Sequence, residues 1–246
     1  MKPFLILQLR PETEVSDDEF DAILRKGGLR EDETHRIRLD SGSRPLPTGL
    51  DLDIYSGVIV GGGPGCVSDP PGKKSEIEQR MEDAVLSLMP DITEGDIPFL
   101  GCCYGIGILA HHLGAEVGQN RYGEEVGGVT CRITKDGKDD PLLQDLPETF
   151  RALVGHKEAV QELPKGCAHL LSSSPCPYQM IRYKQNVYAT QFHPEADGDI
   201  FDLRIRVYKD KGYFAPAEAE ALVTRSREED VCVPERILSG FVKAYR

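Results

Sequence analysis

The sequence predicts an α/β domain with a mostly parallel central sheet and flanking helices. Three short apolar runs, at residues 4–9, 55–60 and 97–100, each end in a Gly-rich or polar turn, as buried parallel strands do. Helical stretches lie between these runs, at residues 17–26 and 75–89, and the second has apolar residues at the 3.6-residue period. Strands that alternate with helices imply βαβ units and therefore a parallel sheet covered by helices.

The second half of the chain has a different pattern. Five short strands follow one another too closely for helical crossovers, so part of this region is predicted to be antiparallel. These strands cover residues 126–133, 150–154, 168–172, 179–183 and 187–192. Helices are expected at 199–211 and 234–245, with a charged and less regular one at 216–230. We therefore expect a single domain over residues 1–246, with its core at about 1–200 and a helical C-terminal extension at 201–246.

The composition argues against several classes of protein. The formal net charge of −12 does not suit a partner with a phosphate backbone, so no nucleic acid is expected. Apolar runs are too short for a transmembrane helix, and no membrane partner is expected. Seven cysteines without a C-x-x-C pair or an export signal fit reduced thiols in the cytoplasm better than disulfides or structural zinc.

A candidate nucleophile lies in the segment Gly101-Cys102-Cys103-Tyr104-Gly105. Here a buried strand meets small residues and enters a helix, which places Cys103 at the helix N-terminus. Unpaired N–H groups and the helix dipole are expected to lower the pKa of a thiol there. The glycines permit a strained turn of the nucleophile-elbow type. A buried cysteine pair that only fills a strand end would give the same pattern.

A candidate base follows a later strand, in His193-Pro194-Glu195. Residues two apart in an extended chain point the same way, and Pro194 stiffens the link between them. His193 and Glu195 can therefore face one site, with the carboxylate orienting the imidazole. A His–Glu pair on the surface is the alternative.

The third candidate element is the glycine-rich run at residues 61–65, directly after a strand. Such a turn exposes backbone N–H groups, which bind phosphate or stabilise an oxyanion. A plain loop that needs positive φ angles would have the same composition.

Taken together and in this order, the three motifs resemble the class I glutamine amidotransferase family. Its nucleophile segment, G-x-C-x-G-x-Q, is matched by Gly101, Cys103 and Gly105. Its H-P-E and G-G-P motifs are matched by His193-Pro194-Glu195 and Gly62-Gly63-Pro64. The resemblance covers about residues 1–200 and is nearest to the stand-alone group related to the glutaminase domain of GMP synthetase. It implies a flavodoxin-like or Rossmann-like three-layer fold and no cofactor or metal.

The resemblance also implies a role for each matched residue. Cys103 would attack the carboxamide carbon of glutamine, His193 would move the proton, and Glu195 would orient His193. The backbone N–H groups of Gly63 and Tyr104 would form the oxyanion hole. Ammonia and glutamate would be released through a γ-glutamyl thioester. The ammonia would pass to an acceptor on another chain, a synthetase, unless there is no acceptor.

Contacts to the substrate are implied by a further match. Residues 154–160 resemble the family's S-H-G-D-x-V strand end, which makes Gly155, His156 and Lys157 candidates, together with Gly65 and Gly107. His156 could equally be a structural histidine at a strand end. Gly107 stands where the family has a glutamine that contributes to glutamine binding.

Three other functions remain open from the sequence. A γ-glutamyl peptide or conjugate hydrolase would use the same triad, and Gly107 would favour it by opening room near the substrate. A dinucleotide- or flavin-binding protein would need G-x-G-x-x-G, but the last position here is Cys66 or Ser68. A binding protein that keeps the fold without turnover would not need the intact Cys103, His193 and Glu195.

Overall fold

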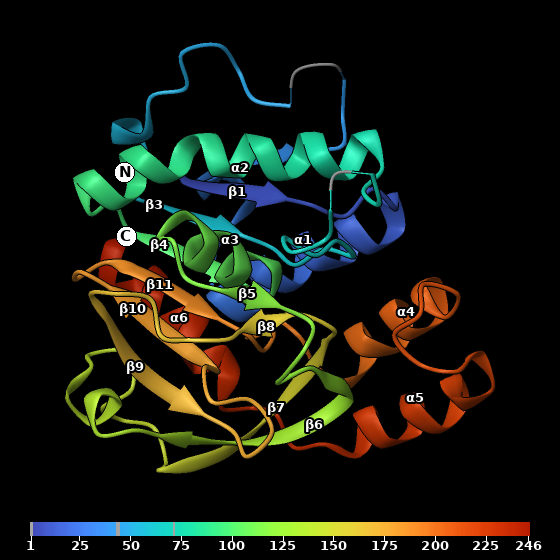
Figure 1. The fold of residues 1–246 in the computed structure, drawn as a ribbon. Coiled ribbons are helices and arrows are strands. Elements are labelled where there is room, and N and C mark those ends of the chain that lie inside the picture. The colour runs from blue at the N-terminus through green and yellow to red at the C-terminus, as the bar shows by residue number, and fades with distance from the viewer. Residues whose placement is uncertain (1, 43–44, 71) are drawn as a thin grey trace.

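The computed structural model describes residues 2–42, 45–70 and 72–246. Within these residues, nine strands form one sheet in the order β2-β1-β3-β4-β11-β10-β9-β6-β7, and helices cover both of its faces (Figure 1). The strands of this sheet are β1 (Phe4–Gln8), β2 (Thr34–Arg38), β3 (Gly57–Val60), β4 (Phe99–Cys102), β6 (Glu124–Ile133), β7 (Thr149–His156), β9 (Cys167–Ser172), β10 (Met180–Tyr183) and β11 (Val187–Thr190). Two short strands, β5 (Val117–Gly118) and β8 (Ala159–Val160), pair separately. The predicted fold class is confirmed.

The helices match the predicted ones closely in position. They are α1 (Thr13–Gly27), α2 (Glu76–Gly95), α3 (Tyr104–His112), α4 (Gly198–Tyr208), α5 (Ala219–Glu228) and α6 (Pro234–Tyr245). Single 3₁₀ turns occur at Glu31–Glu33 (η1), Leu52–Ile54 (η2), Asp136–Asp139 (η3) and Pro216–Glu218 (η4). None of the helices in the described ranges is both long and apolar enough to cross a membrane.

The parallel half of the sheet consists of β2, β1, β3, β4 and β11. Successive residues of β1 point to opposite faces, so Leu5 and Leu7 join the apolar cluster that includes residues of α2 and α3. Phe4 and Ile6 join the cluster on the other face, with residues of α1 and α6. Because both faces are covered, the strand is apolar throughout, and this explains why it is a continuous apolar run in the sequence.

The other half of the sheet is antiparallel, as the short connections predicted. β10 pairs antiparallel with both β11 and β9, and β6 pairs antiparallel with both β9 and β7. β11 therefore joins the two halves, because its other neighbour is the parallel strand β4.

Two features of the fold differ from the sequence-based expectation. Strand β2 was not predicted, because three of its five residues are His or Arg and no apolar run marks it. Helix α2 was predicted to end near Met89 but continues past Pro90 to Gly95. A proline removes a single backbone donor, and the burial of Met89 and Ile92 keeps the helix in place around it.

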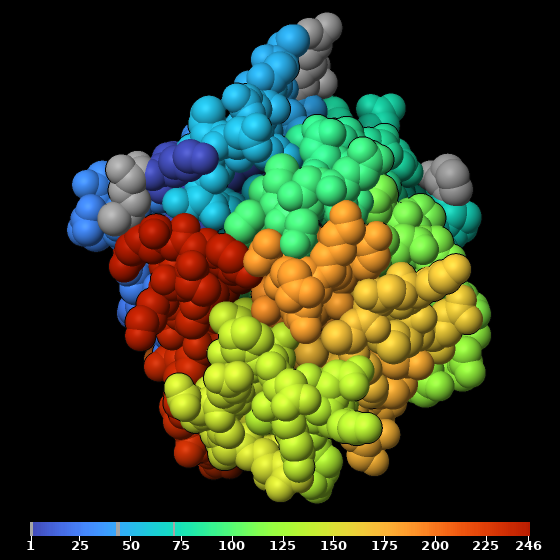
Figure 2. Space-filling model, turned by 90° about the vertical axis from the view of Figure 1, so that its left-hand side faces the viewer, coloured from blue at the N-terminus to red at the C-terminus, as the bar shows by residue number. Residues whose placement is uncertain are grey.

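The C-terminal helix α6 is part of the main core. Phe241 is fully buried, with its ring centroid 6.3 Å from that of Phe4 and 6.4 Å from that of Tyr188. In the space-filling view the yellow-green loop before β7 lies against the red C-terminal helix (Figure 2), and Arg236 Nη2 donates to Asp145 O at 2.8 Å. Helix α6, which was predicted as part of a helical C-terminal extension, thus completes the hydrophobic layer on one face of the sheet.

Truncation of Phe241 tests this packing. We expect Phe241→Ala to lower the free energy of unfolding by about 3–5 kcal/mol, because it removes a buried ring between a helix and the sheet. Ile77→Ala is the matched control, since Ile77 is 40% exposed on α2 and its loss leaves no cavity. Urea unfolding followed by circular dichroism measures both, and equal effects would contradict the packing described.

Candidate active site

The nucleophile candidate Cys103 lies at a sharp turn between β4 and α3. It is the N-cap residue of α3 with φ 53° and ψ −90°, a conformation that non-glycine residues rarely adopt. Its backbone N–H donates to Thr190 O at 2.7 Å, which ties the turn to the end of β11. Gly101 permits the tight packing, because a Cβ there would lie 2.9 Å from the carbonyl carbon of Gly105. The predicted elbow is present.

His193 and Glu195 form a buried pair just beyond β11. His193 Nδ1 lies 2.8 Å from Glu195 Oε1, and both side chains are almost fully buried. The two residues are not in an extended segment, as the sequence analysis assumed, because Ala196 N–H donates to His193 O and closes a turn. Since Nδ1 faces a carboxylate, the proton of the neutral ring belongs on Nδ1, and Nε2 is left as the acceptor.

Cys103 and His193 line the same small cavity. The cavity has a volume of about 50 Å³, and its other walls include Gly63, Arg10 and Tyr213. A second cavity of about 20 Å³ also adjoins Cys103. Ligand pockets are usually several hundred Å³, so the site is nearly closed in this structure.

Burial sets the resting protonation of this site. It raises the pKa of the Cys103 thiol to about 12, although Arg10 and Arg204 act in the opposite direction. The expected lowering of this pKa by the helix N-terminus is therefore wrong for the resting site, because burial outweighs it. Burial also lowers the pKa of His193, so at neutral pH the pair is a neutral thiol beside a neutral imidazole.

Glu195, unlike Cys103 and His193, keeps its charged form in the buried site. Burial alone would raise the pKa of its carboxyl group, but His193 and Arg204 together lower it well below its ordinary value. Glu195 therefore stays ionised and can hold the Nδ1–H of His193.

The glycine-rich loop runs directly past the start of α3. A Cβ on Gly63 would lie 3.0 Å from Leu9 O and 3.1 Å from Tyr104 Cδ1, so glycine permits the close approach. Tyr104 is the first residue of α3, where the backbone N–H has no acceptor within the helix. The two predicted oxyanion-hole residues are thus neighbours, and both line the second cavity with Cys103.

Four of the five predicted substrate contacts line that second cavity: Gly65, Gly155, His156 and Lys157. The fifth, Gly107, is buried in α3, and a Cβ there would lie 2.9 Å from Glu158 Oε1. Glu158 accepts the backbone N–H groups of Val67 and Ser68 and lines the cavity itself. The space that Gly107 was expected to open is therefore filled by the Glu158 carboxylate.

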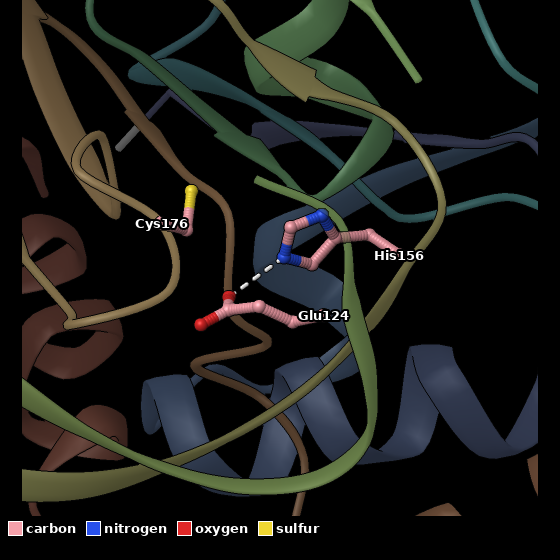
Figure 3. A group of neighbouring side chains, drawn as sticks. All are labelled: Glu124, His156 and Cys176. Carbon is pink, nitrogen blue, oxygen red and sulfur yellow. Dashed lines mark hydrogen bonds and ion pairs between the residues drawn. The ribbon is translucent and has the colours of Figure 1, made fainter. Parts of the chain in front are cut away.

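His156 has both ring nitrogens engaged. Nδ1 lies 2.7 Å from Glu158 O and Nε2 lies 2.8 Å from Glu124 Oε2. Cys176 completes a buried group with these two side chains (Figure 3). Glu124 also accepts hydrogen bonds from Gln179 and Ser173, so protein donors already occupy its oxygens. Both ring nitrogens of His156 are thus used for contacts within the protein. The predicted contact of His156 to substrate is therefore left to its backbone.

Lys157 and Tyr213 together close one side of the site. Lys157 Nζ lies 4.4 Å from the Tyr213 ring centroid and donates to Lys211 O at 3.2 Å. Tyr213 Oη in turn donates to Pro64 O at 3.0 Å, on the glycine-rich loop. The segment after α4, to which the sequence analysis gave no role, is thus a wall of the cavity.

Several cavity residues were missed by the sequence analysis. Arg10, Arg204 and Glu158 are the charged ones, and Gln191 Nε2 lies 4.0 Å from Cys103 Sγ. Gln191 and Arg10 each follow the end of a central strand, a position that could have marked them. Arg204 and Tyr213 lie beyond the last motif, and no local pattern marks them.

Together, the cysteine at the strand-to-helix turn and the buried His–Glu pair form an arrangement that is typical of α/β enzymes with a cysteine nucleophile. The model of the family Glutamine amidotransferase class-I matches residues 22–206. The chain belongs to the class I glutamine amidotransferase family, as the motifs predicted.

Individual relatives agree with this assignment. The chain is 34% identical over 150 residues to the glutamine-hydrolyzing GMP synthase of Thermosipho africanus, over 60% of this chain and 26% of that protein. It is 30% identical over 152 residues to the enzyme of the same name from Streptococcus pyogenes, over 59% of this chain and 25% of that protein. The matched part thus spans about a quarter of these relatives.

Solved structures share the fold along the whole chain. A glutamine amidotransferase from Thermotoga maritima has a TM-score of 0.75 at 20% identity and covers 100% of this chain and 98% of its own. One from Methylobacillus flagellatus has a TM-score of 0.72 at 19% identity, covering 100% and 96%.

The packing of the glycine loop against the His–Glu pair can be tested at Gly62. A Cβ there would lie 2.6 Å from His193 Cε1 and 2.8 Å from Arg10 Nη2. We expect Gly62→Ala to displace the imidazole and lower kcat/KM for the amide substrate by about 100-fold. Gly72→Ala is the control, because a Cβ at Gly72 meets nothing within 4 Å. Similar activity of the two variants would contradict the contact.

Proposed function

We propose that this protein hydrolyses the side-chain amide of glutamine through a γ-glutamyl thioester on Cys103, with His193 and Glu195 completing the triad. The observation that carries the proposal is that Cys103, at a strained strand-to-helix turn, shares one cavity with a His193 held by Glu195. Membership of the glutamine amidotransferase family supports glutamine as the substrate.

The first half of the reaction forms the thioester. His193 Nε2 takes the proton of the Cys103 thiol as the sulfur attacks the carboxamide carbon. The oxygen of the tetrahedral intermediate becomes negative beside the backbone N–H groups of Gly63 and Tyr104. The C–N bond then breaks, His193 returns the proton to the departing nitrogen, and ammonia leaves.

The second half releases glutamate. His193 takes a proton from a water molecule, whose oxygen attacks the thioester carbon. The C–S bond breaks, glutamate leaves, and the proton returns to the sulfur. Glu195 stays ionised throughout and stabilises the imidazolium each time it forms. The neutral resting pair suits this cycle, because charge separates only when substrate is present.

The relatives suggest where the ammonia goes. They are named glutamine-hydrolyzing GMP synthases, and the part that matches this chain is about a quarter of each. We infer that this chain supplies ammonia to a synthetase that provides the acceptor site. A protein that only releases ammonia would need no such partner.

The reaction is tested by ammonia and glutamate release from L-glutamine. We expect Cys103→Ala to lower turnover by about 10⁴-fold or more, because no thioester can form. Cys102→Ala should keep most of the activity, since the Cys102 thiol is buried and its pKa is raised well above the ordinary value. Intact-protein mass spectrometry after acid quench should show the γ-glutamyl adduct on the wild type. Turnover that survives Cys103→Ala would refute the proposed nucleophile.

A second candidate function is hydrolysis of γ-glutamyl peptides or conjugates by the same triad. The leaving group must lie near His193, which protonates it, and the cavity there is walled by Phe201, Ile205 and Phe214. An apolar wall suits the substituent of a conjugate better than it suits ammonia.

Assays of L-glutamine and γ-glutamyl dipeptides side by side separate the two functions. We expect higher kcat/KM for glutamine, because membership of the glutamine amidotransferase family supports glutamine as the substrate. A preference for the dipeptides would replace the first proposal by the second.

A further inference from the structure

Glu195 is held by a second partner besides His193. Its Oε1 atom accepts a hydrogen bond from Arg204 Nη2 at 2.9 Å, while His193 Nδ1 lies 2.8 Å from the same oxygen. Arg204 comes from α4, and only 5% of it is exposed. One carboxylate oxygen is therefore shared by the imidazole and a guanidinium group.

The contact belongs to a larger buried network. Arg204 Nη2 also lies 3.6 Å from Glu19 Oε2 on α1, and that oxygen lies 2.6 Å from Arg10 Nε. Arg10 Nη1 donates to Tyr208 Oη at 3.3 Å, which brings the network back to α4. Three elements, the end of β1, α1 and α4, thus hold the carboxylate of the triad.

The glycine-rich loop is shaped around this network. A Cβ at Gly61 would collide with the Glu19 carboxylate, and one at Gly62 would collide with both Arg10 and His193. Gly61 and Gly62 therefore make room for Glu19, Arg10 and His193.

Stability alone does not explain such a network. Buried ion pairs lose their hydration, and well-packed apolar residues of similar volume often stabilise a protein as well or better. This network lies in the wall of the site, since Arg10 and Arg204 line the cavity that holds Cys103 and His193. A role in the reaction accounts for its position.

We propose that Arg204, supported by Glu19 and Arg10, is a positioning residue that fixes Glu195 and, through it, the ring of His193. The proposal deepens the proposed function and rests on it. Arg204 restrains the carboxylate so that Nδ1 of His193 keeps one orientation and Nε2 is left as the acceptor in the cavity that Cys103 also lines. Glu195, Arg204, Arg10 and Cys103 are the charged and titratable groups nearest the imidazole. Tyr208 and Tyr213 line the same cavity, and Glu19 lies beyond the two arginines.

The sign of the electrostatic effect follows from these groups. Arg204 and Arg10 both oppose protonation of His193 and so lower its pKa, whereas Glu195 favours it. Loss of Arg204 should therefore raise the pKa of His193, and the imidazole should become protonated at a higher pH. Since the reaction needs a neutral His193, the acid limb of the pH profile should move to higher pH.

The test compares Arg204→Gln and Arg204→Lys with the wild type. We expect Arg204→Gln to lower kcat/KM about 100-fold, mainly in kcat, with the acid limb of the profile moved upward. Arg204→Lys keeps a cation and should retain more activity than Arg204→Gln, with a smaller shift of the limb. Arg206→Gln is the matched control on the same helix, because Arg206 pairs with Asp202 and Glu220 on the exposed side.

A second measurement separates positioning from folding. Arg204→Ala removes the guanidinium group beside the cavity, and guanidinium chloride at millimolar concentration should restore part of its kcat/KM. Thermal unfolding of each variant is measured beside activity. The proposal is overturned if Arg204→Gln keeps kcat/KM and the pH profile of the wild type. It is also overturned if all three Arg204 variants lose activity only in proportion to unfolded protein, without rescue by guanidinium.

A wrong proposed function can be distinguished from a wrong role for Arg204. In that case the wild type turns over neither glutamine nor γ-glutamyl peptides. Alkylation of Cys103 by iodoacetamide, in a Cys102→Ala background, then provides the readout. His193 accepts the thiol proton in both proteins, and loss of Arg204 should raise the pKa of His193. We therefore expect the pH dependence of the alkylation rate to move to higher pH in Arg204→Gln than in the parent. Identical pH dependence would overturn the proposal even without a known substrate.

Discussion

The parallel pairing of β4 with β11 is the constraint on which the site depends. In this register Cys102 is the partner of Thr190, and the backbone N–H of Cys103 donates to Thr190 O. The carboxyl ends of parallel strands meet at one edge of a sheet, where ligands bind in folds of this type. Cys103 and the His–Glu pair therefore emerge next to each other from the ends of two paired strands, although they are far apart in the sequence. β11 is also the strand at which the sheet changes from parallel to antiparallel.

Burial is the second constraint, and it follows from the first. A site at the sheet edge is closed here by α4, by Tyr213 and by the glycine-rich loop. Burial of His193 and partial burial of Cys103 favour the neutral forms of both side chains. The same closure makes every unpaired charge expensive. Glu195 and Glu19 must therefore be matched by Arg204 and Arg10, and the buried cluster carries two charges of each sign.

How far the sequence could predict this site depends on how far apart in the sequence the interacting residues lie. The elbow, the His–Glu pair and the glycine loop are local motifs, because each needs only a strand end and a few residues after it. Their placement was therefore predicted, with the turn at Glu195 as the one change in geometry. Strand β2 could not be recognised, since its charged side chains carry no apolar pattern. The pKa of Cys103 was predicted in the wrong direction because burial depends on segments, such as residues 201–214, that no local pattern connects to it. Glu158 was missed for the same reason, and with it the fact that Gly107 leaves no open space.

The two constraints together explain why glycine occupies positions 61, 62 and 107. A glutamine at position 107 would compete for space with Glu158, whose carboxylate is already held by two backbone N–H groups. Side chains at positions 61 and 62 would compete with Glu19, Arg10 and His193. In both places a backbone without a side chain allows a charged group from another segment to approach the site. The glycines and the charged residues are thus coupled, because a side chain introduced at any of these positions would displace a buried charge from its partners. A substitution at one of these glycines therefore requires a compensating change at the charged residue that it faces.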